Sequence, residues 1–257
     1  MITFKVLLEY DGTRYSGWQE QKNARTVMGQ LREAARDVFR TDVEMQGAGR
    51  TDAGVHALGQ VMHIKLASAV KQSPSPDLIM RRLNDLLPAD IAILRVERTN
   101  RNFHARHDAR SRVYIYQISR RKQAFTKRQV WWVKDDLDVD RMKRAISLLP
   151  GRHDFVCFRA ADTSRPSEST IVEVGTAEIE TDNDIIQIRI EASHFLWRMV
   201  RRIVGVLVKL GKHELTLDEF QQLLNADCDS KVDIAAWTAP ASGLFLEEVR
   251  YGAPPGA

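Results

Sequence analysis

The sequence predicts an α+β protein made of two similar halves that meet near residue 104. Stretches with the two-residue alternation of strands are interspersed with stretches of helical spacing, and two of the strands form a predicted hairpin. With 257 residues the chain can bury a sizeable core, as one large domain or as two closely packed halves. We therefore expect an N-terminal α/β half over residues 1–104, a C-terminal α/β half over 105–251 and a disordered tail over 252–257.

The first half is predicted to contain two helices and four strands. Thr26 can cap the first helix, because a threonine side chain can accept a hydrogen bond from a free backbone amide of the first turn. The apolar face of this helix carries Val27, Leu31, Ala34, Ala35 and Val38. The second helix begins at about Pro76 and ends before Pro88. Its apolar residues are Ile79, Leu83, Leu86 and Leu87. The strands are expected at residues 2–9, 43–46, 60–66 and 91–97.

The second half is predicted to have the same character. A hairpin is expected where strands 171–180 and 185–191 meet at the turn residues 182–184. Helices are expected at residues 139–149, which Gly151 terminates, at 195–210 and at 217–224. The remaining strands are expected at 113–118, 155–158 and 244–249.

Composition and cysteine usage predict a reduced cytoplasmic protein. No apolar run is long enough to cross a bilayer, and residues 1–10 alternate rather than forming the apolar core of a signal peptide. Cys157 and Cys228 lie far apart and form no CxxC motif, so we expect neither a disulfide framework nor a zinc cluster. The net charge of +4 mildly favours an anionic partner.

Basic residues are concentrated in two stretches. Between Arg95 and Arg128 lie Arg98, Arg101, Arg106, Arg110, Arg112, Arg120, Arg121, Lys122 and Lys127, opposed by Glu97 and Asp108. Within this stretch the strand alternation places Tyr114 and Tyr116 on one face, where aromatic rings among cations can stack bases. A polar stripe of Arg198, Arg201, Arg202 and Lys209 follows the predicted helix 195–210. One such stripe is usually a solvated helix face, but two basic features together favour contact with RNA or DNA.

Residues 46–57 form the segment with the most chemical information. It differs from a dinucleotide-binding fingerprint, because Asp52 stands where GxGxxG needs glycine and its charge would repel a pyrophosphate. The segment is instead a glycine-flanked loop that presents Arg50, Asp52 and His56. Its glycines, Gly47, Gly49 and Gly54, permit unusual backbone conformations and close approach of a ligand. A tight turn in which Asp52 caps backbone amides is the alternative that spacing leaves open.

The stretch GAGRTDAGVHA resembles the signature of the tRNA pseudouridine synthase A (TruA) family, whose invariant aspartate falls at Asp52. Further resemblances follow in order along the chain. They are Glu9-Tyr10-Asp11-Gly12 with Tyr15, Gly17, Trp18 and Gln19; Phe103-His104-Ala105-Arg106; Arg112 to Tyr116; His153-Asp154-Phe155 with Phe158-Arg159-Ala160; Phe195 with Met199 to Gly205; and Gly243 to Leu246. The sequence departs from the family pattern at Ser169, at Trp197 and Arg198, and at Arg202. These departures put RNA contacts in doubt rather than the chemistry of Asp52.

The resemblance implies that uridine is isomerised to pseudouridine with Asp52 as the catalytic carboxylate. Arg201 matches the arginine that keeps this aspartate charged and oriented. Tyr114 matches the active-site tyrosine, which would stack on the uracil and help to remove the C5 proton. The expected substrate-binding residues are Tyr114, Arg50, Leu244, Arg106 and His56. For His56, support of the loop is a more direct expectation than catalysis.

The resemblance also implies two RRM-like halves, each with a mostly antiparallel sheet flanked by helices, and a basic cleft between them. The implied partners are tRNA, modified at positions 38, 39 and 40 of the anticodon stem-loop, and a second copy of the chain. The isomerisation changes no oxidation state and adds no group, so no cofactor is expected. No metal is expected either, although His104, His107 and Asp108 superficially resemble ligands.

Two other functions remain open on sequence alone. A non-catalytic RNA-binding protein or RNA chaperone would bind tRNA equally well without the carboxylate of Asp52. An aspartate-dependent hydrolase of nucleosides or glycosides normally uses paired carboxylates, and the Asp52 loop contains no second acid.

Overall fold

The computed structural model describes residues 2–66, 74–161, 169–228 and 232–252. The chain forms two compact units. The first unit comprises Met1–Arg110 and Phe245–Ala257, and the second comprises Ser111–Leu244. The chain thus passes into the second unit after Arg110 and returns to the first for its last strand. Most of the tail expected to be disordered, residues 253–257, lies outside the described residues.

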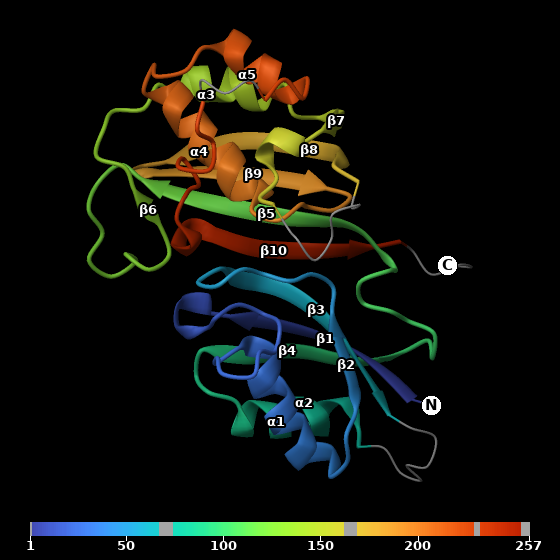
Figure 1. The fold of residues 1–257 in the computed structure, drawn as a ribbon. Helices are drawn as coiled ribbons and strands as arrows, with labels where there is room; N and C mark the ends of the chain where they lie inside the picture. The colour runs from blue at the N-terminus through green and yellow to red at the C-terminus, as the bar shows by residue number, and fades with distance from the viewer. Residues whose placement is uncertain (1, 67–73, 162–168, 229–231, 253–257) are drawn as a thin grey trace. The chain divides into compact units, whose positions relative to one another are not determined.

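A mixed sheet forms the centre of the first unit (Figure 1). Its strands are β1 (Ile2–Tyr10), β2 (Glu44–Gly47), β3 (His56–Leu66), β4 (Ile91–Thr99) and β10 (Leu244–Tyr251). Their order is β4-β1-β3-β10, and β2 also pairs with β3. The pairs β1–β3, β1–β4 and β2–β3 are antiparallel, whereas β10 runs parallel to β3. The last strand therefore extends a sheet that the first hundred residues begin.

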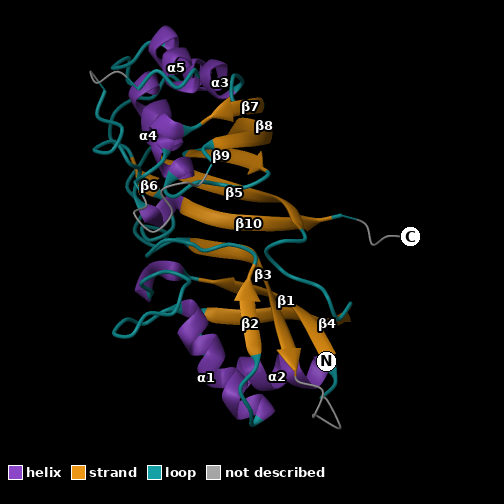
Figure 2. Cartoon of the chain, turned by 45° about the vertical axis from the view of Figure 1, so that its right-hand side comes forward, coloured by secondary structure: helices purple, strands orange, loops and turns teal. Residues whose placement is uncertain are grey.

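Helices α1 (Val27–Phe39) and α2 (Pro76–Leu86) cover one face of this sheet (Figure 2). Alternate residues of β1, namely Phe4, Val6 and Leu8, are fully buried. Thr26 caps α1 as predicted, accepting from the backbone N–H of Gly29 at 3.2 Å. All the predicted apolar residues of α1 are buried.

Leu86, one of the apolar residues expected on α2, does not lie on the buried face of the helix. Its side chain is 49% exposed, whereas Ile79 and Leu83 are fully buried. The helix ends at Leu86, because Leu87 has an extended backbone that leads into Pro88. Near a helix end, apolar spacing alone does not decide which side chain meets the sheet.

The second unit is also built on β-strands. Its strands are β5 (Ala109–Ser119), β6 (Trp131–Trp132), β7 (Gly151–Asp154), β8 (Ile171–Asp182) and β9 (Ile185–Ala192). They follow the order β5-β9-β8-β7 with antiparallel pairs, and β6 pairs in parallel with β5. The predicted hairpin is confirmed as β8–β9, and Asn183 takes the left-handed conformation (φ 50°) that its tight turn requires.

The helices of the second unit are α3 (Val139–Ile146), α4 (Met199–Gly211) and α5 (Leu217–Leu224). The predicted bounds of α5 are confirmed, with a capping box between Thr216 and Glu219. Helix α4 begins at Met199 and not at residue 195, because Arg198 has a left-handed backbone (φ 61°) that interrupts the helical path.

The strand predicted at residues 155–158 is absent, since Val156–Phe158 form a 3-10 turn. The carboxylate of Asp154 accepts from the N–H of Val156 at 3.1 Å, which bends the chain immediately after β7. The short apolar run favours a strand by its composition, but this local side-chain hydrogen bond turns the chain into a 3-10 turn instead.

The expectation of unpaired cysteines is wrong. Cys157 and Cys228 form a disulfide with a Cα–Cα distance of 5.3 Å, although 71 positions separate them in sequence. The bond joins the 3-10 turn after β7 to the segment that follows α5. Sequence spacing could not reveal the pair, because only the folded second unit brings these two segments together.

The structure also bears on membrane insertion. Over the described ranges, no helix combines the length and the apolar character needed to span a bilayer.

Leu31 and Leu86 offer a matched test of this packing. Leu31 on α1 is fully buried, so we expect Leu31→Ala to lower the free energy of unfolding by about 2–5 kcal/mol. Leu86→Ala removes the same atoms from a half-exposed position and should cost less than about 1 kcal/mol. Urea unfolding measures the free energy of unfolding of both variants. Equal costs for the two variants would contradict the assigned helix faces.

Candidate active site

Asp52 lies in the loop between β2 and β3, and the N-terminal segment of the first unit holds the backbone of this loop. The N–H of Trp18 donates to the carbonyl of Thr51 at 3.0 Å, and the N–H of Gly54 donates to the carbonyl of Tyr15 at 3.3 Å. Main-chain bonds thus anchor the loop on both sides of Asp52. Asp52 itself is partly exposed.

The glycines around this loop have different functions. Gly54 has φ 77°, a left-handed conformation that favours glycine. A Cβ on Gly47 would lie 2.5 Å from the Trp18 ring, so this glycine makes room for the indole. A Cβ on Gly49 would meet nothing within 4 Å. Gly17, outside the loop, has φ 94°, and a Cβ there would lie 2.8 Å from the Thr51 carbonyl.

A buried polar network fixes the residue before Asp52. The Tyr10 hydroxyl and the Thr51 hydroxyl are 2.7 Å apart and form a hydrogen bond. The amide of Gln60, itself fully buried, donates to the carbonyl of Gly49 at 3.1 Å. Burial raises the pKa of Tyr10 to about 12, so its phenol stays protonated and available as a hydrogen-bond partner. Sequence reasoning gave no role to Tyr10, Thr51 or Gln60.

His56 lies in the interior of the first unit, with 2% of its surface exposed. Its ring stacks on Phe245 of β10 at a centroid distance of 4.6 Å. Its Nδ1 lies 3.1 Å from both the Gly12 N–H and a carboxylate oxygen of Asp11. These contacts tie the start of β3 to the turn after β1 and fit the expectation that His56 supports the loop. Arg50, by contrast, is exposed.

Arg106 lies in the segment between β4 and β5, where neighbouring side chains hold the peptide before it. The N–H of Ala105 donates to His63 Nδ1 at 3.0 Å, and the Tyr251 hydroxyl donates to the Ala105 carbonyl at 2.6 Å. Burial lowers the pKa of His63, which favours the neutral ring that this acceptor role needs. In the described parts of the chain, no group of three or more His, Cys, Asp or Glu side chains is arranged to hold a metal.

In the second unit, Arg201 is fixed by main-chain contacts in the first turn of α4. Its Nε donates to the carbonyl of Ala239 at 2.7 Å, and the Ala239 N–H donates to the Arg201 carbonyl at 3.0 Å. Close approach of Trp237 to the helix requires Gly205, where a Cβ would lie 1.8 Å from the Trp237 carbonyl oxygen. Arg201 therefore does not belong to a fully solvated stripe.

The other positions of the expected stripe and the departures from the family pattern also make specific contacts. Arg202 donates to the carbonyl of Arg159. Arg198 lies over the Trp197 ring, 4.9 Å from its centroid, and both side chains are exposed. The Ser169 hydroxyl accepts from the N–H of Ile171 at 3.3 Å.

Tyr114 and Tyr116 are both buried in the second unit. Tyr114 is 8% exposed, and its ring packs edge-on against Phe195 at 4.9 Å. Tyr116 is fully buried and donates to the carbonyl of Pro240 at 2.8 Å; burial raises its pKa, and the nearby charge of Arg201 opposes that rise. Leu244, at the start of β10, is 6% exposed.

The residues expected at the site thus divide between the units. Arg50, Asp52 and His56 lie on one loop and the strand after it, and Arg106 belongs to the same unit. Arg201, Tyr114 and Leu244 belong to the second unit. Main-chain hydrogen bonds hold the Asp52 loop in the first unit and Arg201 in the second.

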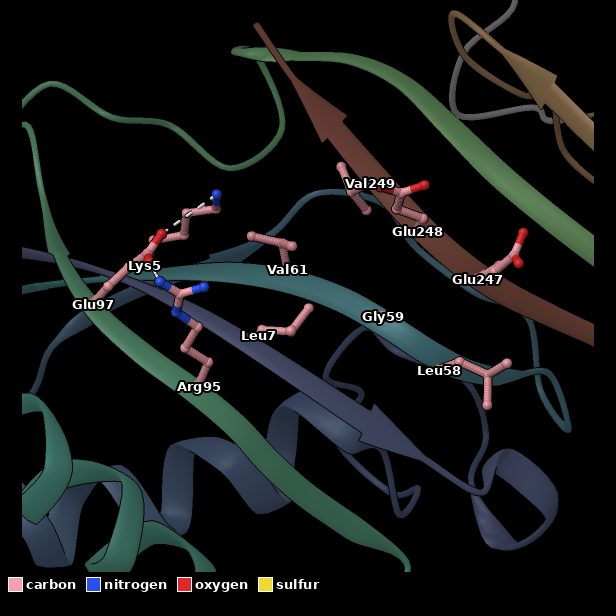
Figure 3. Close-up of a pocket in the computed structure, with 10 residues that line it drawn as sticks. All are labelled: Lys5, Leu7, Leu58, Gly59, Val61, Arg95, Glu97, Glu247, Glu248 and Val249. Carbon is pink, nitrogen blue, oxygen red and sulfur yellow. Dashed lines mark ion pairs between the residues drawn. The ribbon is translucent and has the colours of Figure 1, made fainter. Parts of the chain in front are cut away.

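A separate pocket of about 310 Å³ lies in the first unit (Figure 3). Lys5, Leu7, Val61 and Val249 are among its lining residues, and Glu97 pairs there with Lys5 at 3.5 Å and with Arg95 at 3.1 Å. No residue predicted for the active site is among those that line this pocket.

Comparisons with known proteins identify the family. A family model described as tRNA pseudouridine synthase matches residues 7–108 and 145–252. Proteins named tRNA pseudouridine synthase A from Thermoanaerobacter sp. (strain X514) and Acetivibrio thermocellus are 40% and 39% identical to the chain. A third protein of that name, from Thermodesulfovibrio yellowstonii, is 36% identical. Each alignment covers 98% of this chain and 100% of the relative. The chain belongs to the tRNA pseudouridine synthase A family.

Proposed function

We propose that the protein isomerises uridine to pseudouridine in tRNA, with Asp52 as the catalytic carboxylate. Family membership over nearly the whole chain supports the reaction and the substrate. The observation that supports Asp52 is its position, because the loop backbone is bonded on both sides while the residue itself stays partly exposed. Such a site limits the freedom of the reacting group before the substrate arrives.

The reaction breaks the bond between ribose C1′ and uracil N1, turns the base, and joins C1′ to C5. The proton on C5 must then leave. A carboxylate can begin this sequence as a nucleophile at C1′, by addition at C6, or by the deprotonation that leads to a glycal. Asp52 serves in each route. All three conserve the atoms of the nucleotide and need no external oxidant or reductant.

Arg201 and Tyr114 are the proposed partners of Asp52, in a basic cleft between two RRM-like halves. Arg201 would keep Asp52 ionised and oriented, and its fixed Nε supports a pre-set geometry. Tyr114 would stack on the uracil and assist removal of the C5 proton. Its packing against Phe195 supports a fixed ring orientation.

The remaining proposed roles concern RNA binding. Arg50, which is exposed, and Arg106 would hold phosphates, since arginine forms strong paired hydrogen bonds to them. Leu244 would line the apolar side of the uracil pocket. His56 acts indirectly by supporting the loop, in keeping with its burial. The proposed substrate positions are 38, 39 and 40 of the anticodon stem-loop, and the proposed location is the cytoplasm.

Tritium release from tRNA labelled at uridine C5 tests this function. Wild-type protein should release tritium, and Asp52→Asn should reduce release by at least about 10³-fold, because the amide cannot replace the carboxylate in any of the three routes. A tRNA-binding measurement on the same variant confirms that the protein is intact. Binding without release by the wild type would favour a non-catalytic RNA-binding protein. Turnover of free nucleosides without RNA would favour a hydrolase.

The polar network beneath Asp52 predicts a graded effect on catalysis. Thr51→Val keeps the shape of the side chain but removes the hydroxyl that bonds Tyr10, so the loop should shift and kcat should fall about 10- to 100-fold. Thr51→Ser keeps the hydroxyl and should stay within about threefold of wild type. Tyr10→Phe should resemble Thr51→Val. Wild-type kcat in both Thr51→Val and Tyr10→Phe would exclude the network from positioning Asp52.

We also propose a homodimer in which one tRNA contacts both protomers, as family resemblance implies. Light scattering should then give twice the 29.3 kDa mass of one chain. A monomer at the concentrations used for activity assays would contradict the shared-tRNA arrangement.

A further inference from the structure

We propose that the second unit carries an additional RNA-binding surface, formed by Lys122, Phe125, Lys127, Trp132 and Lys134. This basic aromatic surface would stack an unpaired base of the tRNA on Phe125 or Trp132 and hold the neighbouring phosphates with its lysines. The inference deepens the proposed function, because it rests on tRNA as the substrate. It adds contacts outside the residues proposed for the reaction.

The first observation is the exposure of Phe125. Its side chain is 100% exposed, so it contributes nothing to the core of the second unit. By contrast, Tyr114 and Tyr116 of the same basic stretch are 8% and 0% exposed. Phe125 in this stretch and Trp132 just beyond it are therefore aromatic rings exposed to a base in solution. Lys122 and Lys127 flank Phe125 in sequence, and an exposed ring with nearby cations is the combination that binds single-stranded nucleic acid.

The second observation is that the segment carrying Phe125 is anchored at its base. It leaves β5 after Ser119 and returns as β6, which pairs with β5 through Ile118 and Trp131. The N–H of Val133 donates to the Ser119 carbonyl at 3.1 Å, and the N–H of Arg120 donates to the Asp184 carbonyl at 2.8 Å. A side chain on an anchored segment loses less conformational entropy on binding than one on a free loop.

The third observation is the arrangement of charge around Trp132. Trp131 packs nearly perpendicular to Tyr116, with ring centroids 6.3 Å apart, and alternation places Trp132 on the other side, 38% exposed. The ammonium groups of Lys134 and Lys122 lie 5.4 and 6.0 Å from the centroid of the Trp132 ring. Cations beside an aromatic face can hold a phosphate while the ring holds the base.

Acidic residues near this surface are mostly paired with other cations. Asp184 pairs with Arg121 at 2.6 Å, and Asp135 pairs with Lys212. Asp136 is exposed and subtracts from the local positive charge. The exposed Lys122, Lys127 and Lys134 outweigh it, so the surface is complementary to a polyanion.

Phe125→Ala is the most direct test, because a fully exposed side chain can be removed without disturbing the core. We expect Phe125→Ala to raise the Kd for a tRNA transcript about tenfold, from the loss of one stacked base. The slope of log Kd against log salt should not change, since no charge is lost. Phe125→Tyr keeps the ring and should bind within about twofold of wild type.

The double variant Lys122→Gln/Lys127→Gln tests the phosphate contacts. It should weaken binding and reduce the magnitude of the salt slope by about one for each lysine. The matched control is Lys143→Gln/Arg144→Gln, which removes the same charge from exposed positions of α3 in the same unit. This control should bind tRNA as wild type does.

Activity separates this proposal from the proposed function. Phe125→Ala should raise KM for tRNA and leave kcat at saturating tRNA unchanged, whereas Asp52→Asn should abolish turnover and keep binding. Wild-type Kd for both Phe125→Ala and Lys122→Gln/Lys127→Gln would overturn the surface. Equal weakening by Lys143→Gln/Arg144→Gln would also overturn it, because the effect would then follow net charge alone.

Discussion

The attachment of the Asp52 loop to the segment after β1 is the constraint on which the proposed site depends. Two main-chain bonds, from Trp18 to Thr51 and from Gly54 to Tyr15, hold the loop at either side of the carboxylate. The bond to Thr51 needs the close approach that Gly17 permits, because a side chain there would meet the Thr51 carbonyl. Residues separated by more than thirty positions in sequence thus form one structural element.

The hydrogen bonds of this element gain strength from burial. Tyr10 and Gln60 are buried, so an unpaired hydroxyl or amide there would carry a desolvation cost of about 1–3 kcal/mol. That cost favours the single arrangement in which Thr51 and Gly49 are bonded. The polar network therefore acts more as a restraint on geometry than as a source of net stability, which suits a loop that must present a charged group.

The last strand links the Asp52 loop to the end of the chain. β10 runs parallel to β3, and its Phe245 stacks on His56, the residue that supports the far side of the Asp52 loop. Gly59 permits this pairing, since a Cβ there would lie 2.3 Å from the Glu247 carbonyl oxygen. The first unit is therefore complete only when the chain has passed through the second unit and returned.

The sequence by itself determined the family, most secondary-structure elements and the position of Asp52. It did so because helix caps, apolar periodicity and a glycine-rich loop are local properties, visible within about ten residues. Thr26 as a cap, the β8–β9 hairpin and α5 are elements of this kind. The assignment of roles to Asp52, Arg201 and Tyr114 came from resemblance to the family and not from these patterns.

Only the tertiary structure decided which residues meet across long separations. It paired Cys157 with Cys228, buried Tyr114 and Tyr116 inside a basic stretch, and left Phe125 exposed. It also supplied the Tyr10, Thr51 and Gln60 network and the parallel strand β10. The physical reason is common to all of these: burial and pairing depend on the neighbours that folding brings together, and a one-dimensional pattern records only neighbours along the chain.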